Sequence, residues 1–113
     1  MSKGDFLGEF EQLVLLALIR VGEGAYGMTV RREIEDRAAR DVSIGAVYAT
    51  LDRLEEKGLV KSHVGGPTDS RGGRAKKCFR ITGAGAKALE RSQAAVRQML
   101  EGLPARWNPK PSR

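Results

Sequence analysis

Six basic side chains gather between residues 61 and 80 of this 113-residue chain, accompanied by one acid. The basic residues are Lys61, Arg71, Arg74, Lys76, Lys77 and Arg80, and the acid is Asp69. Six cations and one anion give the segment a net charge of +5, out of a formal +6 for the whole chain. Like charges this dense repel one another unless a polyanion meets them, so the segment is typical of a nucleic-acid-binding surface. A merely solvated run of charge is the alternative.

Other kinds of chemistry find little support in the sequence. The single cysteine, Cys78, excludes a disulfide within the chain, and with His63 as the one histidine there is no set of metal ligands. We interpret both as strand and packing residues. Ser43 has no histidine partner beyond His63 and no oxyanion motif, and the glycine-rich stretch 65–74 lacks the spacing of a phosphate-binding P-loop. We therefore expect no enzyme, no cofactor and no metal.

The basic segment must be positioned by a β-hairpin. Residues 59–64 and 75–81 alternate in polarity, which predicts two strands with Phe79 and Ile81 facing inward. Val60, Ser62 and Val64 share one face, whereas the outward side chains are Lys61, His63, Lys76 and Arg80. The connection 65–74 is longer and richer in glycine than a tight turn, and its tip carries Arg71 and Arg74. Arginines on such a tip suit the narrow minor groove of DNA.

Four helices are predicted around the hairpin. Apolar spacing places them at 7–21, 26–39, from an N-cap at Ser43 to Gly58, and from a cap at Thr82 to about residue 103. The expected fold is mainly α with a two-stranded β-hairpin wing, a winged helix-turn-helix in the order α-α-α-β-β-α. We expect a DNA-binding domain over 7–82, a dimerisation helix over 83–103 and, from its three prolines, a disordered tail over 104–113.

The third helix is the candidate recognition helix. Val47, Leu51 and Leu54 form its core face, and a helix-turn-helix inserts the first half of its second helix into the major groove. Small residues there let the helix backbone approach the bases. Tyr48 has an equal alternative, packing beside Leu51, and Arg53 could pair with Glu56 although we favour DNA. The predicted DNA contacts are Ser43, Gly45, Ala46, Tyr48, Ala49, Arg53, Lys61, Arg71, Arg74, Lys76 and Lys77.

Apolar residues also predict a second copy of the chain as a partner. The helix over 7–21 is apolar on nearly all sides, so it needs a cover on two faces. The last helix carries a further apolar stripe. The predicted dimer interface consists of Leu15, Leu16, Ile19, Leu89, Val96, Met99, Leu100 and Leu103.

One run of sequence resembles a known family. The run from Ser43 to Val60, SIGAVYATLDRLEEKGLV, with Tyr26-Gly27 before it and RITGAG from Arg80 to Gly85 after it, is similar to the PadR family of bacterial transcriptional regulators. The resemblance covers about residues 8–100. It implies a winged-helix homodimer, usually a repressor, that dimerises through its first and last helices. Ala49 stands where many members have proline, and the single helix after the wing matches the compact branch of the family.

The sequence therefore predicts a dimeric, sequence-specific repressor that binds a double-stranded DNA operator. The alternative is a winged-helix protein-interaction module that uses the same helix and the same basic hairpin. A small-molecule effector would be an addition to the first hypothesis, and no pocket signature identifies one. The longest apolar run, 13–19, has seven residues where a membrane span needs about 18, so we expect a soluble, cytoplasmic protein without a membrane partner.

Overall fold

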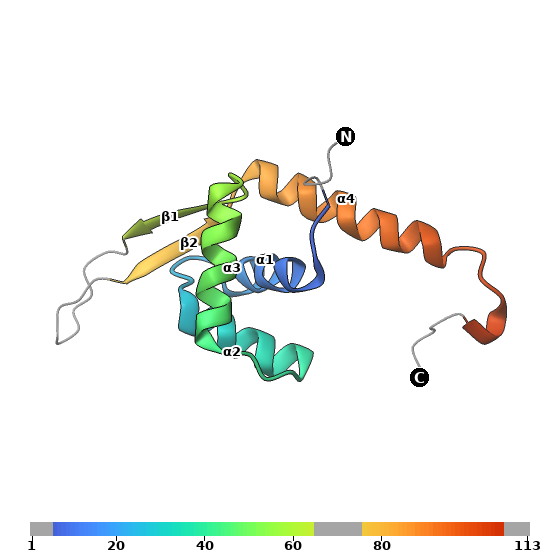
Figure 1. Cartoon of the computed structure of the whole chain (residues 1–113), viewed down its shortest axis with the longest axis horizontal. Coiled ribbons are helices and arrows are strands. Elements are labelled where there is room, and N and C mark those ends of the chain that lie inside the picture. The colour runs from blue at the N-terminus through green and yellow to red at the C-terminus, as the bar shows by residue number, and fades with distance from the viewer. Residues whose placement is uncertain (1–5, 65–75, 108–113) are drawn as a thin grey trace.

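The computed structural model describes residues 6–64 and 76–107. Its elements are α1 (Glu9–Val21), α2 (Gly27–Ala38), α3 (Ile44–Glu56), β1 (Val60–Val64), β2 (Lys77–Ile81), α4 (Gly83–Leu100) and the 3-10 helix η2 (Ala105–Trp107). Figure 1 shows α1, α2 and α3 packed as one body, with the hairpin leaving on one side and α4 on the other. The order and the mainly helical content confirm the predicted winged-helix fold. Arg71 and Arg74, in the predicted wing tip, lie outside the described residues.

The core lies where the three helices of the body meet the root of the hairpin. Val47, Leu51 and Leu54, the predicted core face of α3, are completely buried. They pack in one cluster with residues of α1 and α2 and with Phe79 of β2. Spacing of i, i+4 and i+7 places the α3 side chains on one helix face, and their burial against the other helices is the main stabilisation available to a helix of 13 residues.

Caps fix both ends of α3 and the start of α4 at the predicted residues. The Ser43 hydroxyl accepts a hydrogen bond from the backbone N–H of Ala46 at 3.0 Å, which satisfies one of the free N–H groups of the first turn of α3. Gly58 follows α3 with φ of 79°, a left-handed conformation that favours glycine. The Thr82 hydroxyl accepts from the N–H of Gly85 at 3.0 Å and donates to the carbonyl of Gly58 at 2.8 Å, so it joins the start of α4 to the end of α3.

The two strands pair antiparallel in the register Val60 with Ile81, Ser62 with Phe79 and Val64 with Lys77. The backbone N–H of Phe79 also donates to the carbonyl of Ala25 at 2.9 Å, which ties β2 to the loop between α1 and α2. Val64 lies on the expected face but is 70% exposed, because the far end of the hairpin reaches beyond the body.

Helix α4 is attached to the body along its N-terminal part, as far as Gln93. The Ser92 hydroxyl accepts from the N–H of Leu7 at 3.0 Å, and the amide of Gln93 donates to the side-chain oxygen of Gln12 at 2.8 Å. The helix ends at Leu100, three residues before the predicted end. The 3-10 helix shows that the expected tail has local structure as far as Trp107, and residues 108–113 lie outside the description. Among the helices described, none combines the length and apolarity needed to cross a membrane.

Candidate nucleic-acid interface

The first half of α3 presents small side chains to solvent. Gly45, Ala46 and Ala49 are all exposed, as is the N-cap Ser43. A Cβ added at Gly45 would meet no atom within 4 Å, so this surface is open. A helix start with free N–H groups and short side chains can approach a phosphate or a base edge closely.

Tyr48 projects from this half of α3 and packs on the start of α2. A Cβ at Gly27 would overlap the phenol ring of Tyr48, so the ring occupies the space that glycine leaves open. Tyr48 as a whole remains 36% exposed, on the same half of α3 as the small residues. The packing alternative therefore holds in part, through a contact with Gly27 of α2. Gly27 was missed as a site residue, although the Tyr26-Gly27 pair in the family resemblance was a signal for it.

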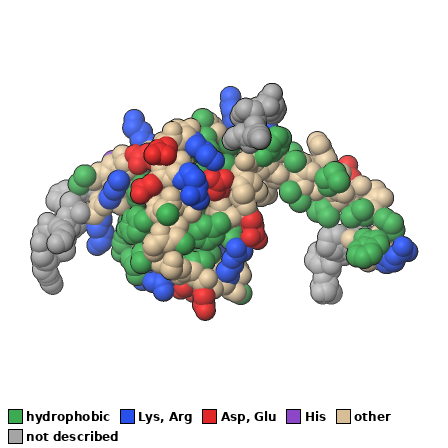
Figure 2. Space-filling view, viewed as in Figure 1, with side chains coloured by type: hydrophobic (Ala, Val, Ile, Leu, Met, Phe, Trp, Pro, Cys, Tyr) green, Lys and Arg blue, Asp and Glu red, His purple; other side chains and the backbone are tan. Residues whose placement is uncertain are grey.

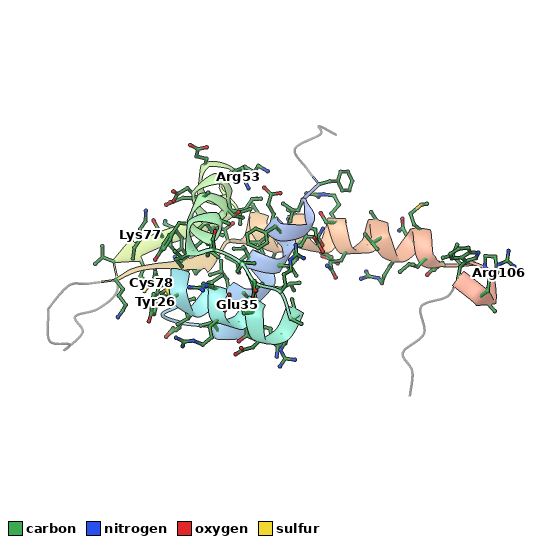
Figure 3. All side chains as sticks on the ribbon, turned by 60° about the horizontal axis from the view of Figure 1, so that its bottom comes forward. Tyr26, Glu35, Arg53, Lys77, Cys78 and Arg106 are labelled. Atoms are coloured by element: carbon green, nitrogen blue, oxygen red, sulfur yellow. The ribbon has the colours of Figure 1, made fainter. Side chains whose placement is uncertain are left out.

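Arg53, on the second half of α3, is engaged within the chain. Its Nε donates to Glu11 Oε2 at 3.4 Å and its Nη2 donates to the Thr50 hydroxyl at 3.3 Å. Lys57 Nζ donates to the same oxygen of Glu11 at 3.0 Å. Figure 3 places Arg53 at one end of α3, away from Tyr26 and Lys77 on the hairpin side. The intramolecular partner is thus Glu11 of α1, not the neighbouring Glu56.

Glu11 is a nearly buried carboxylate that holds these cations. Burial by itself raises the pKa of Glu11, but the backbone N–H of Gly8 donates to Oε1 at 2.9 Å and Lys57 and Arg53 donate to Oε2. Together these bonds and the charge of Lys57 outweigh burial and lower the pKa below its ordinary value of 4.5. Glu11 is therefore ionised at neutral pH and fixes the second half of α3 to the start of α1.

The described part of the hairpin carries its basic side chains in solvent. Lys61, Lys76, Lys77 and Arg80 are all exposed. Lys76 Nζ lies 4.9 Å from the centre of the Tyr26 ring, at the start of α2, and this cation–π contact places positive charge beside the helix-turn-helix. Figure 2 shows basic side chains along the hairpin. Over the C-terminal end of α3, which is its upper end in Figure 1, acidic and basic side chains are mixed.

Cys78 and His63 are opposite each other in the hairpin register, with Cys78 buried and His63 exposed. Cys78 therefore has the packing role expected of it. Within the described residues, no group of three or more histidine, cysteine or acidic side chains is placed to hold a metal ion.

The residues predicted for the dimer interface fall into two groups. Leu15 and Leu89 are buried in the core of the single chain and Leu16 is partly buried against that core. The expectation that Leu15 and Leu89 bury surface between chains is therefore wrong, because the fold of one chain already covers them. The residues still exposed are Ile19, Val96, Met99, Leu100 and Leu103.

Comparison with known proteins assigns this arrangement to a family. The model of the transcriptional regulator PadR-like family matches residues 15–91, about two thirds of the chain, and includes all of α2, α3 and the hairpin. The chain belongs to the PadR-like family. No curated protein sequence matches it closely.

Solved structures, PadR regulators among them, share the fold. A PadR family transcription regulator from hypervirulent Clostridium difficile R20291 is 27% identical, with a TM-score of 0.67 over 81% of this chain and 91% of that one. The complex structure of hsRosR-S4 is 25% identical, with a TM-score of 0.63 over 88% of this chain and 79% of that one. A PadR-like transcription factor from Bacteroides fragilis, at 24% identity and a TM-score of 0.67, covers 81% and 84% and supports the fold alone. The chain is thus a member of a family of transcriptional regulators.

Proposed function

We propose that this PadR-like regulator is a sequence-specific DNA-binding repressor that acts as a homodimer. The observation that carries the proposal is the first half of α3: it is capped by Ser43 and presents small, exposed side chains, and its Tyr48 packs on Gly27, next to the Tyr26 ring that Lys76 of the basic hairpin contacts. These are the features that a helix needs in order to enter a major groove next to a wing that contacts the flanking DNA.

The two elements divide the work of binding. Ser43, Gly45, Ala46 and Ala49 bring the start of α3 against the bases and the nearest phosphate, and the exposed edge of Tyr48 contacts the groove wall. The hairpin supplies the sequence-independent part through Lys61, Lys76 and Lys77, and Arg71 and Arg74, which the sequence predicts for the wing tip, add to it. Such phosphate contacts position a protein on DNA, whereas base-edge contacts select the sequence.

Arg53 takes a different role in this proposal from the one that the sequence suggested. Its guanidinium is held by Glu11 and Thr50, so it supports the orientation of α3 rather than reading a base. The side chain is 52% exposed, and its outer N–H groups can still meet a phosphate at the edge of the site.

A homodimer accounts for the apolar surface that one chain leaves exposed. Val96, Met99 and Leu100 lie uncovered on α4, and Ile19 lies uncovered on α1. Two-fold pairing would present two copies of α3 to DNA, which favours a pseudo-palindromic operator. A dimer bound at a promoter excludes the polymerase, so repression is the simplest consequence. We place the protein in the cytoplasm, where it meets DNA, and propose no catalytic activity.

The rival is a protein-interaction module that uses α3 and the hairpin on a protein. The salt dependence of binding distinguishes the DNA-binding hypothesis from the protein-interaction hypothesis. The logarithm of the DNA association constant should fall linearly with the logarithm of salt concentration, by about 0.9 for each phosphate neutralised. Apolar docking of a protein should depend far less on salt. A small-molecule effector that binds this regulator would be compatible with the repressor hypothesis.

The operator sequence can be identified by selecting the DNA fragments of the source genome that the protein binds.

The decisive experiment compares basic residues on the hairpin with one elsewhere. Arg71→Ala, Arg74→Ala and Lys77→Ala should each lower the salt slope by about one per chain and weaken binding to operator and random DNA alike. Lys87→Ala is the matched control, because Lys87 is exposed on α4 and away from the hairpin. If all four variants had the same salt slope as the wild type, the basic run would be only a solvated surface, and the protein-interaction hypothesis would be favoured.

A further inference from the structure

Helix α4 carries one apolar stripe, of which the body of its own chain covers only the first half. Gly85, Ala88, Leu89 and Ser92 are buried. The same helix face continues at i+4 and i+7 from Ser92 through Val96 and Met99, which are 56% and 78% exposed. The stripe therefore runs on past the end of its own body and needs a second surface to cover it.

The apolar surface does not stop where α4 stops. After the helix, the N–H of Trp107 donates to the carbonyl of Pro104 at 2.8 Å and forms a short turn that displays the indole with 64% of its surface exposed. Leu103, on the same turn, is also exposed. Figure 1 shows this tip at the far end of α4, away from α1 and α2. The tip therefore cannot reach the α1–α2 surface of its own chain.

An apolar groove of matching kind lies between α1 and α2. It has a volume of about 410 Å³, and its apolar lining includes Leu13, Leu16, Ala17, Ile34 and Ala38. Arg20, Glu33 and Arg37 form its rim, where Glu33 Oε2 accepts from Arg20 at 2.8 Å and Arg37 lies at 3.5 Å. The rim keeps a net positive charge, and Ile19, already assigned to the dimer surface, lines the same groove.

We infer that Trp107 of one protomer seats in the α1–α2 groove of a second copy of this chain. The tip presents a large, rigid aromatic side chain, the type that most often anchors an interface in a pocket. Glu101, at the end of α4, brings an acid to the two arginines of the rim. In a two-fold dimer the contact forms twice, and each α4 then ends on the first helix of the partner's helix-turn-helix. The inference rests on the homodimer of the proposed function and adds the residue and the pocket that hold its outer ends.

The chain contains a single tryptophan, so its fluorescence reports this contact directly. In the dimer, wild-type Trp107 should emit at shorter wavelength than a free indole and should be several-fold less quenched by iodide. Ala38→Arg places a bulky side chain in the groove at an exposed position that its helix tolerates. It should shift the emission to longer wavelength and restore full quenching while sedimentation still shows a dimer. Ala86→Arg is the matched control on an exposed turn of α4, and it should change neither the emission wavelength of Trp107 nor its quenching by iodide.

A double-mutant cycle tests the partnership of the two residues. Trp107→Ala should raise the dimer dissociation constant by about tenfold or more, as loss of an interface anchor does. Ala38→Arg should raise it similarly, and the double variant should be little worse than either single one, because both remove the same contact. Two results in a dimeric protein would overturn the inference and leave the homodimer proposal intact. In the first, iodide quenches wild-type Trp107 fully; in the second, Trp107 is equally shielded from iodide in wild type and in Ala38→Arg. A monomer with an exposed Trp107 overturns both, and sedimentation distinguishes the two cases.

Discussion

The two halves of α3 present different surfaces to their surroundings. The first half has exposed small residues and a serine cap, and its aromatic side chain, Tyr48, lies on Gly27 of α2. In the second half, Arg53 and the C-cap residue Lys57 are joined to Glu11 of α1. One continuous helix thus has an open end suited to a ligand and a closed end attached to the body.

This difference shows how a short helix can be both exposed and well positioned. A recognition helix needs side chains that DNA can reach, and exposed side chains contribute little to the stability of the fold. The buried side chains of Val47, Leu51 and Leu54 and the ion pairs at the C-terminal end of α3 hold the helix in place and so set the orientation of its open end. The comparison can be tested by changing each half in turn.

The largest effect is expected at the open end. Ala49→Glu places a carboxylate where the phosphates of the groove would lie, and operator affinity should fall by about 3 kcal/mol, or roughly a hundredfold, from repulsion and lost close approach. The melting temperature should stay within a few degrees, because Ala49 is exposed. Ala86→Glu, exposed on α4, is the control in the same binding titration. Full operator affinity in Ala49→Glu would place the DNA surface elsewhere.

The contact between Gly27 and Tyr48 should give the next largest effect. In Gly27→Ala the new methyl group overlaps the ring of Tyr48, so the ring or α2 must move, at a cost of about 1 to 3 kcal/mol in the free energy of unfolding. Gly45→Ala is the matched control, because its methyl group meets open space and alanine favours a helix by up to about 1 kcal/mol. Chemical denaturation of the two variants should therefore give opposite signs. Equal stabilities would mean that the ring is not held against Gly27.

The smallest effect is expected at the closed end and depends on pH. Because the pKa of Glu11 is lowered in the folded chain, its carboxylate stabilises the fold above its ordinary value of 4.5, and this stabilisation is lost as the pH falls through the lowered pKa. Glu11→Gln should cost about 1 kcal/mol near neutrality, since both cations are partly in solvent, and less as the solution is acidified. Glu9→Gln, at an exposed ion pair with Arg40, is the control. Parallel stability–pH curves for Glu11→Gln and wild type would contradict this role of the carboxylate.

Local patterns were enough to predict the elements of the fold. Ser43 and Gly58 mark the ends of α3 because each satisfies a backbone requirement of its own helix terminus. Phe79 was placed in the core by strand alternation alone. Such signals involve residues that are close in sequence, so periodicity and capping chemistry can be read without knowing the packing.

The contacts that orient the candidate site were not predicted, because they join distant segments. Arg53 and Glu11 are 42 residues apart, and the sequence offered the nearby Glu56 as the obvious partner. The contact of Lys76 with Tyr26 joins residues that are still farther apart along the chain. Leu15 was assigned to the wrong surface because a helix that is apolar on all sides does not reveal which face its own chain covers.

One bond between the hairpin and the body joins two backbone groups, the N–H of Phe79 and the carbonyl of Ala25. Only proline at position 79 would remove its donor, so this bond makes almost no demand on side-chain identity, and the exposed side chains of the hairpin take no part in it. The exposed positions of the hairpin can therefore change over evolutionary time while the strand keeps its place beside the helices. A regulator built in this way can acquire a new set of DNA contacts by substitution without redesigning its fold.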